Sequence, residues 1–220
     1  MKLSDAVHAN RAMTIMEVVV VVIIVAALIA IVLPAFVPDQ HYAHRSVNIS
    51  CINNLKEDGL ALKIWAGDHN DHWPQFLSVT NGGAKELLSA GNVAAYFETM
   101  SNELSTPKIL ACPADEEHAA TFNFTTLANT NISFFVSLDA AESRPLEPVF
   151  GDDNFAVDDV PVKPGLINLW TNRSVAWTAR RHHFAGNVAL ADGSVRQMSN
   201  ASLTNFVAEP GAATNLVVIP

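Results

Sequence analysis

The C-terminal part of the sequence holds the residue types that could do acid–base or nucleophilic chemistry. His182 and Asp192 stand with nine residues between them, and His183 directly follows the first histidine. A histidine oriented by a carboxylate is half of a hydrolase triad. However, the sequence contains no Gly-x-Ser-x-Gly nucleophile motif and no glycine-rich phosphate loop. We therefore expect His182 to be a structural residue of a sheet and the chain not to be an enzyme. Catalysis and metal binding by His182 are the alternatives.

A second candidate site is an acidic segment. Four carboxylates lie within eight residues, at Asp152, Asp153, Asp158 and Asp159. They repel one another, and a bound hard cation such as calcium would relieve that repulsion. We expect a hydrated surface loop, with calcium as the one candidate cofactor.

The chain has two cysteines, Cys51 and Cys112. Neither belongs to the Cys-x-x-Cys pair that is typical of a zinc site. In an exported domain an even number permits a disulfide, which for a loop of about 60 residues contributes about 4 kcal/mol in the chain-entropy model. Two buried free thiols and metal ligation are the alternatives, because sequence does not show whether the two residues meet.

Several segments must position these residues, and a hairpin is the clearest. Two apolar-alternating runs, 187–191 and 194–198, flank Asp192-Gly193, which predicts a hairpin with a type I′ turn. Composition predicts other strands at 108–113, 132–138 and 148–151, and an edge strand at 216–219. Helical pieces are expected at 84–89, 93–104 and 203–209.

A longer helix precedes these elements. Apolar or small residues at steps of three and four form one stripe that we expect to pack on the protein's own sheet. The helix should end in the segment from Asp68 to Pro74, whose Asx residues and proline favour a solvated turn. The stripe consists of Ile52, Leu55, Gly59, Leu62 and Ala66.

The N-terminal part contains a membrane-spanning candidate. From Val18 to Val37 no side chain is charged or strongly polar, and about 20 apolar residues in a helix cover the roughly 30 Å of a bilayer's hydrocarbon. A cleavable secretory signal normally has a shorter apolar core. Glu17 at the border is a lone carboxylate, and such a residue usually has a partner.

Charge limits the range of functions. The formal net charge of the 220 residues is −9, and all of it belongs to the part after Pro38, because two cations and two carboxylates precede that residue. An acidic domain without a basic stripe has no electrostatic reason to bind nucleic acid. About 180 residues suffice for one domain with one core.

The order of residues at the N-terminus resembles the signature of type IV pilins and of the pseudopilins of type II secretion. A small residue, a hydrophobe, Thr, Ile, Met and Glu precede an unbroken apolar run with a late proline, here from Ala12 to Pro34. The resemblance implies cleavage by a prepilin peptidase between Ala12 and Met13, followed by N-methylation. It also implies a helix bend at Pro34 and a role of Glu17 in assembly, as partner of a neighbouring subunit's N-terminal ammonium.

Three further segments and the C-terminal block resemble prepilin-like proteins of planctomycete, verrucomicrobial and related bacteria. That group shares a motif of His, nine residues and Asp-Gly, matched here by His182, Asp192 and Gly193. The three segments are Cys51-Ile-Asn-Asn-Leu-Lys, Cys112-Pro-Ala-Asp and Asn131-Ile-Ser-Phe-Phe-Val-Ser-Leu-Asp.

Together these observations predict an α+β, pilin-like fold with a long N-terminal helix packed on an antiparallel sheet. Residues 1–12 would be a leader, 13–38 the transmembrane half of the helix and 39–220 a globular head, in which 39–67 continue the helix. The resemblance places the protein in the inner membrane as a single-pass protein with a cytoplasmic N-terminus and a periplasmic head. Its partners would be the peptidase, other subunits of a filament and the inner-membrane secretion platform. A membrane-anchored periplasmic metal-dependent enzyme or ligand-binding module is the alternative.

Overall fold

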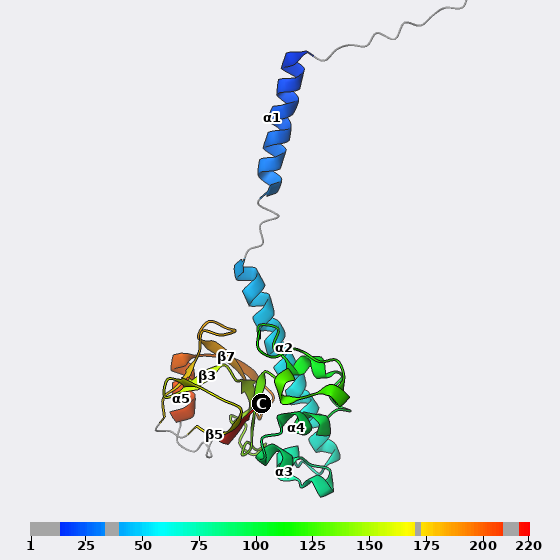
Figure 1. Cartoon of the computed structure of the whole chain (residues 1–220), viewed down its shortest axis with the longest axis vertical. Coiled ribbons are helices and arrows are strands. Elements are labelled where there is room, and N and C mark those ends of the chain that lie inside the picture. Colours follow the sequence, from blue (N-terminus) through cyan, green and yellow to red (C-terminus); the bar gives the residue numbers. More distant parts are fainter. Residues whose placement is uncertain (1–13, 34–39, 170–172, 209–215) are drawn as a thin grey trace, which may run out of the picture. The chain divides into compact units, whose positions relative to one another are not determined.

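The structure is a computed structural model that describes residues 14–33, 40–169, 173–208 and 216–220 (Figure 1). The chain forms two compact units, residues 1–43 and residues 44–220. The predicted cleavage site at Ala12 and Met13 lies outside the described residues, and so does Pro34.

Helix α1, Ile15–Val32, is the first element. Thr14 caps it, because its side-chain oxygen accepts a hydrogen bond from the backbone N–H of Glu17 at 3.3 Å. Every residue of α1 is exposed, and within the described ranges it is the one helix long and apolar enough to cross a membrane. At about 1.5 Å per residue, its 18 residues extend about 27 Å.

Helix α2, Gln40–Asp68, supplies one wall of the globular unit from residue 44 onward. The predicted stripe is correct at Leu55, Leu62 and Ala66, which are buried, whereas Ile52 and Gly59 are only half-buried. The buried face overlaps the predicted stripe and includes other residues of α2, one of which is the charged Asp58. Its members are Cys51, Leu55, Asp58, Ala61, Leu62, Trp65 and Ala66.

Short helices connect α2 to the sheet. Helix α3, Lys85–Ser89, confirms the piece predicted at 84–89, and α4, Val93–Thr99, confirms the first part of the piece predicted at 93–104. Both helices share one core with α2. The strand predicted at 108–113 is wrong. Pro107 begins the 3-10 helix η4, Pro107–Leu110, there, since proline at a first helical position is preorganised and Thr106 accepts a hydrogen bond from Lys108. The other 3-10 helices are η2, Pro74–Phe76; η3, Val79–Asn81; η5, Phe124–Thr126; and η6, Asn129–Asn131.

An antiparallel six-stranded sheet forms the centre of the globular unit, in the order β5-β9-β1-β2-β7-β8. The C-terminal strand was predicted to be an edge strand, but it lies between β5 and β1. The strands are β1, Phe134–Ser137; β2, Pro148–Asp152; β5, Gly165–Asn168; β7, Ala185–Leu190; β8, Val195–Ser199; and β9, Leu216–Ile219.

A smaller antiparallel sheet, in the order β4-β3-β6, and helix α5 complete the unit. Strand β3 is Phe155–Val157, β4 is Val160–Pro161, β6 is Val175–Trp177, and α5 is Asn200–Ala208. Because successive residues of a strand face opposite sides, each central strand serves two cores. On β1, for example, Phe134 packs in the core with α2, whereas Phe135 packs in the core with α5 and the smaller sheet.

The predicted hairpin is confirmed as β7 and β8, but its turn differs. Gly193 has a φ of 88°, whereas Asp192 does not have positive φ, so the turn is not type I′. Gly193 N donates to Leu190 O, and Leu190 N donates to Ser194 O. These bonds define a type I turn followed by a left-handed glycine, the common three-residue hairpin connection. The α+β class predicted from the sequence is thus confirmed.

Candidate functional site

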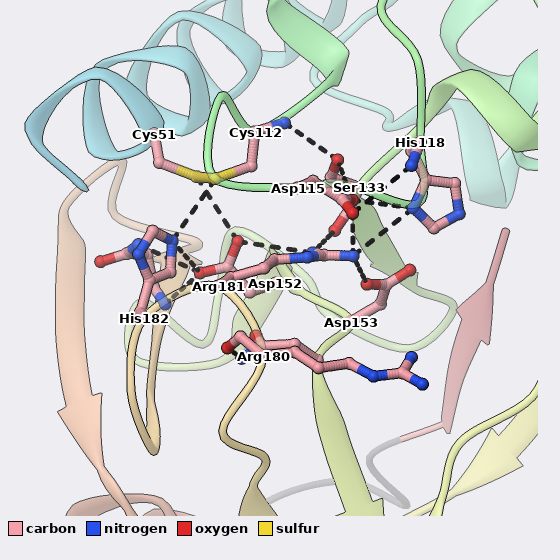
Figure 2. A network of polar contacts seen from close by, with 12 residues as sticks. Cys51, Cys112, Asp115, His118, Ser133, Asp152, Asp153, Arg180, Arg181 and His182 are labelled. Carbon is pink, nitrogen blue, oxygen red and sulfur yellow. Dashed lines mark hydrogen bonds and ion pairs between the residues drawn. A yellow bond between two sulfur atoms is a disulfide. The ribbon is translucent and has the colours of Figure 1, made fainter. Parts of the chain in front are cut away.

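A buried polar network lies where α2, the loop after η4 and the strands β1, β2 and β7 meet (Figure 2). The residues that form it come from segments far apart in the sequence. They are Cys51, Cys112, Asp115, His118, Ser133, Asp152, Asp153, Arg181, His182 and Asn187.

A disulfide joins Cys51 of α2 to Cys112 of the loop after η4, with the two Cα atoms 5.0 Å apart. Both cysteines are buried. The bond closes a loop over a sequence separation of 61 residues, which corresponds to about 4 kcal/mol in the chain-entropy model. It therefore ties the helix to the loop that precedes the sheet.

Arg181 lies at the centre of the network. Its guanidinium passes beneath the disulfide toward the carboxylates in Figure 2. Nη2 lies 2.6 Å from Oδ2 of Asp115 and also pairs with Oδ1 of Asp153, while Nη1 donates to the backbone oxygen of Ser133 at 2.8 Å. Nη1 lies 3.9 Å from Oδ1 of Asp152. A buried charge is tolerated only when it is paired and hydrogen-bonded, and Arg181, at 4% side-chain exposure, meets that condition.

Asp115 accepts hydrogen bonds from several sides. Its Oδ2 lies 2.8 Å from Nδ1 of His118 and accepts from the Ser133 hydroxyl at 2.6 Å. Burial alone would raise the pKa of this carboxyl, but the His118 bond, the Arg181 charge and the Ser133 hydroxyl offset burial and hold the pKa well below its usual range. The same bond raises the pKa of His118. The pair is therefore an ion pair when His118 is protonated.

Asp152 ends strand β2, Asp153 follows it, and both are buried. Burial raises the pKa of each to about 6, although the Arg181 charge opposes that shift. Oδ2 of Asp152 accepts hydrogen bonds from Asn187 N at 2.7 Å and from its Nδ2 at 3.0 Å. Nδ2 of Asn187 also donates to Oδ1 of Asn48 in α2 at 2.9 Å. Strand β7, β2 and α2 are thus joined by one chain of side-chain hydrogen bonds.

His182 is buried, and its ring points toward the disulfide (Figure 2). Nε2 lies 3.4 Å from Sγ of Cys112 and 3.5 Å from Oδ2 of Asp152. Burial, together with the neighbouring charges of Arg181 and His183, lowers the pKa of His182 to about 4. The imidazole is therefore neutral near pH 7.

His182 and Asp192 do not face each other, because the two residues lie at opposite ends of β7. Asp192 is exposed in the hairpin turn, where its Oδ1 accepts from Ser194 N at 2.7 Å. Its backbone oxygen accepts from Lys63 Nζ of α2 at 2.9 Å. The hairpin therefore runs along α2. The His182 end of β7 lies near the disulfide, and the Asp192 end lies near Lys63.

The acidic segment divides into two parts. Asp152 and Asp153 belong to the buried network, so the predicted hydrated surface loop is wrong for them. Asp158 and Asp159 lie in the turn after β3, both with positive φ, and Asp158 pairs with Arg173 at 2.8 Å. The calcium hypothesis stays a prediction.

Glu17 lies in the first turn of α1 and is exposed. Within residues 14–33 no cation pairs with its carboxylate. Its predicted role in assembly depends on a second subunit.

Sequence reasoning missed Arg181, Asp115 and Asn187 as members of the site. The segment Cys112-Pro-Ala-Asp was singled out for resemblance, and it ends in Asp115. Arg181 directly precedes the histidine of the C-terminal motif, a position that gave no indication of burial. Its φ of 59° belongs to a tight turn, and His183 and Phe184 in that turn also have positive φ.

Comparison with protein-family models, curated proteins and solved structures found no match to this chain.

Proposed function

We propose that the protein is a pilin-like structural subunit that is anchored in the inner membrane and polymerises through its apolar helix. The observation that carries the proposal is α1, an exposed apolar helix with a single carboxylate, Glu17, in its first turn. A helix of this composition is stable only in lipid or against other apolar helices. The membrane holds the single subunit, and neighbouring helices would replace the lipid in a filament.

In filament assembly, Glu17 would provide a specific contact between neighbouring subunits. A carboxylate within the apolar phase costs about 2.5 to 3.5 kcal/mol at the bilayer centre and less near the interface. The N-terminal ammonium of a neighbouring processed subunit would pair with it and remove that cost. The prepilin peptidase that creates this ammonium and the inner-membrane secretion platform are proposed partners.

The globular unit has features suited to a subunit that bears load. The disulfide connects α2 to the loop after η4, and the Asn187–Asn48 and Lys63–Asp192 bonds connect the same helix to β7 and to the hairpin turn. Three large apolar side chains of α2 are exposed and so available to a neighbouring subunit, namely Ile49, Leu60 and Ile64.

The variant Glu17→Ala tests the proposal in the producing cells. We expect the protein to remain in the membrane fraction and to be processed, while its incorporation into filaments falls about tenfold or more, since each 1.4 kcal/mol changes an equilibrium tenfold. Glu57→Ala, which removes an exposed carboxylate of α2, is the matched control and should assemble normally. Normal incorporation of Glu17→Ala would remove the assembly role.

A further inference from the structure

The disulfide has two further donor side chains beside it. One oxygen of Asp152, Nε2 of His182 and the two sulfur atoms of Cys51 and Cys112 all lie within 4.8 Å of one another. All four residues are buried. Two sulfurs, an imidazole nitrogen and a carboxylate oxygen form a donor set that suits zinc.

The separations between these donors also suit a tetrahedral metal. With metal–ligand distances of about 2.0 to 2.3 Å, the donors of a tetrahedral zinc site lie about 3.3 to 3.8 Å apart. Sγ of Cys112 lies 3.4 Å from Nε2 of His182, and Sγ of Cys51 lies 3.5 Å from Oδ1 of Asp152. Nε2 of His182 lies 3.5 Å from Oδ2 of Asp152. The contacts of Cys51 and His182 use different oxygens of Asp152, so its carboxylate binds the metal through both oxygens or turns to present one, and the two bonded sulfurs must separate to admit the ion.

We infer that the reduced protein binds one zinc ion through Cys51, Cys112, Asp152 and His182. The disulfide and the zinc ion are then two alternative links between α2 and the loop after η4. This inference concerns the globular unit and does not depend on the proposed role in a filament. In either form α2 stays connected to the loop after η4.

The exchange between the two forms balances with a dithiol reductant. The reductant donates two electrons, its own thiols become a disulfide, and the Cys51–Cys112 bond breaks to give two thiols that take up the two protons. Zinc then binds the two sulfurs as thiolates and releases two protons. Newly made chains, whose cysteines have not yet been oxidised, reach the zinc form without any reductant.

The surroundings of the four donors support this assignment. Asn187 holds Asp152 with two hydrogen bonds and is itself bonded to Asn48, which is the kind of outer support that orients metal ligands. Two thiolates and a carboxylate around a divalent ion leave one negative charge, and the Arg181 guanidinium 3.9 Å from Asp152 compensates it. A hollow of about 560 Å³ has Cys112 in its lining and so borders one of the four donors.

Cobalt(II) titration of the full-length protein in detergent tests the inference. The protein is reduced, freed of reductant without oxygen and titrated, and thiolate-to-cobalt charge-transfer absorption is followed. We expect one equivalent to bind to the reduced protein, none to the oxidised protein, and zinc to displace the cobalt. His182→Gln and Asp152→Asn should each weaken binding about 10- to 100-fold or more.

Two exposed residues serve as controls. His183→Gln, next to His182, and Asp159→Asn, a carboxylate outside the buried network, should leave the cobalt spectrum unchanged. If reduction unfolds the protein, near-UV circular dichroism that returns with one equivalent of zinc supports the inference. Failure of zinc to restore the signal overturns it, as does absence of cobalt binding or a cobalt spectrum that His182→Gln and Asp152→Asn leave unchanged.

Discussion

Arg181 shows how much of the globular unit depends on one side chain. It pairs with Asp115 and Asp153, lies near Asp152 and also donates to the backbone of Ser133. These partners come from segments that meet only in the folded chain, so the guanidinium both neutralises and aligns them. Three buried carboxylates would lose their shared cation if Arg181 were replaced.

Replacement of Arg181 by methionine should therefore destabilise the globular unit by about 3 to 5 kcal/mol, since breaking a buried ion pair leaves charges without compensation. Urea unfolding followed by near-UV circular dichroism measures this change. Arg180→Met is the matched control, because Arg180 is 57% exposed and pairs with the exposed Glu117. It should cost less than about 1 kcal/mol. Equal effects of the two variants would contradict the central role of Arg181.

The His118–Asp115 pair predicts a pH dependence. Because the folded state raises the pKa of His118, the pair's contribution is fully present below the unfolded pKa of about 6.5 and is lost as pH rises through the higher folded value. The unfolding free energy of the wild type should thus decrease as pH rises above about 6.5. His118→Gln should show a smaller decrease, because it lacks the part that His118 contributes. Parallel pH profiles of the two proteins, measured by urea unfolding, would refute the prediction.

At the scale of elements, α2 contains an unusual residue in its buried face. Asp58 is fully buried, and neither of its carboxylate oxygens has a hydrogen-bond partner among the described residues. Burial, and to a lesser extent the charge of Glu57, raises its pKa well above the usual value. The folded state therefore favours the protonated form, and stability should fall as pH rises from about 4 through the folded pKa.

Asp58→Asn removes this dependence because an amide carries no charge. We expect the variant to be more stable than the wild type by about 1 to 3 kcal/mol at pH 8, and to differ little at pH 4. Thermal and urea unfolding at both pH values provide the measurement. Glu98→Gln, on the exposed face of α4, should change neither value by more than about 0.5 kcal/mol. A gain at pH 4 equal to that at pH 8 would argue against the protonation mechanism.

Patterns of neighbouring residues predicted the hairpin and the helix α2, because both depend on residues that lie close together in the sequence. The hairpin β7–β8 was found because Asp192-Gly193 interrupts two alternating runs, and α2 because its apolar residues recur at helical steps. The predicted stripe of α2 is buried at Leu55, Leu62 and Ala66, whereas the buried Asp58 is a residue that an apolar pattern does not select. Pro107 began a 3-10 helix where composition indicated a strand.

Long-range pairing explains the other differences. Leu216–Ile219 was recognised as a strand, but its interior position depends on pairing with β1 and β5, which no local pattern specifies. His182 lies close to Asp192 in sequence but does not approach it. It instead contacts Cys112 and Asp152, which are 70 and 30 residues away, because β7 carries the two motif residues to opposite ends.

At the scale of the whole molecule, the two units have contrasting surfaces. Helix α1 exposes only apolar side chains beyond Glu17, whereas the part after Pro38 carries the entire net charge of −9. Such a division is typical of a protein that keeps one part in lipid and the other in water. In the proposed function, the apolar helix later becomes the shared centre of a filament.

Mass spectrometry of the protein isolated from its own cells tests this account most directly. The account predicts a chain that begins at Met13 with a methylated amino group, so that Glu17 is its fifth residue and can pair with the new terminus of a neighbour. A chain that still begins at Met1, or one that begins beyond Val37 and has therefore lost α1, would contradict it.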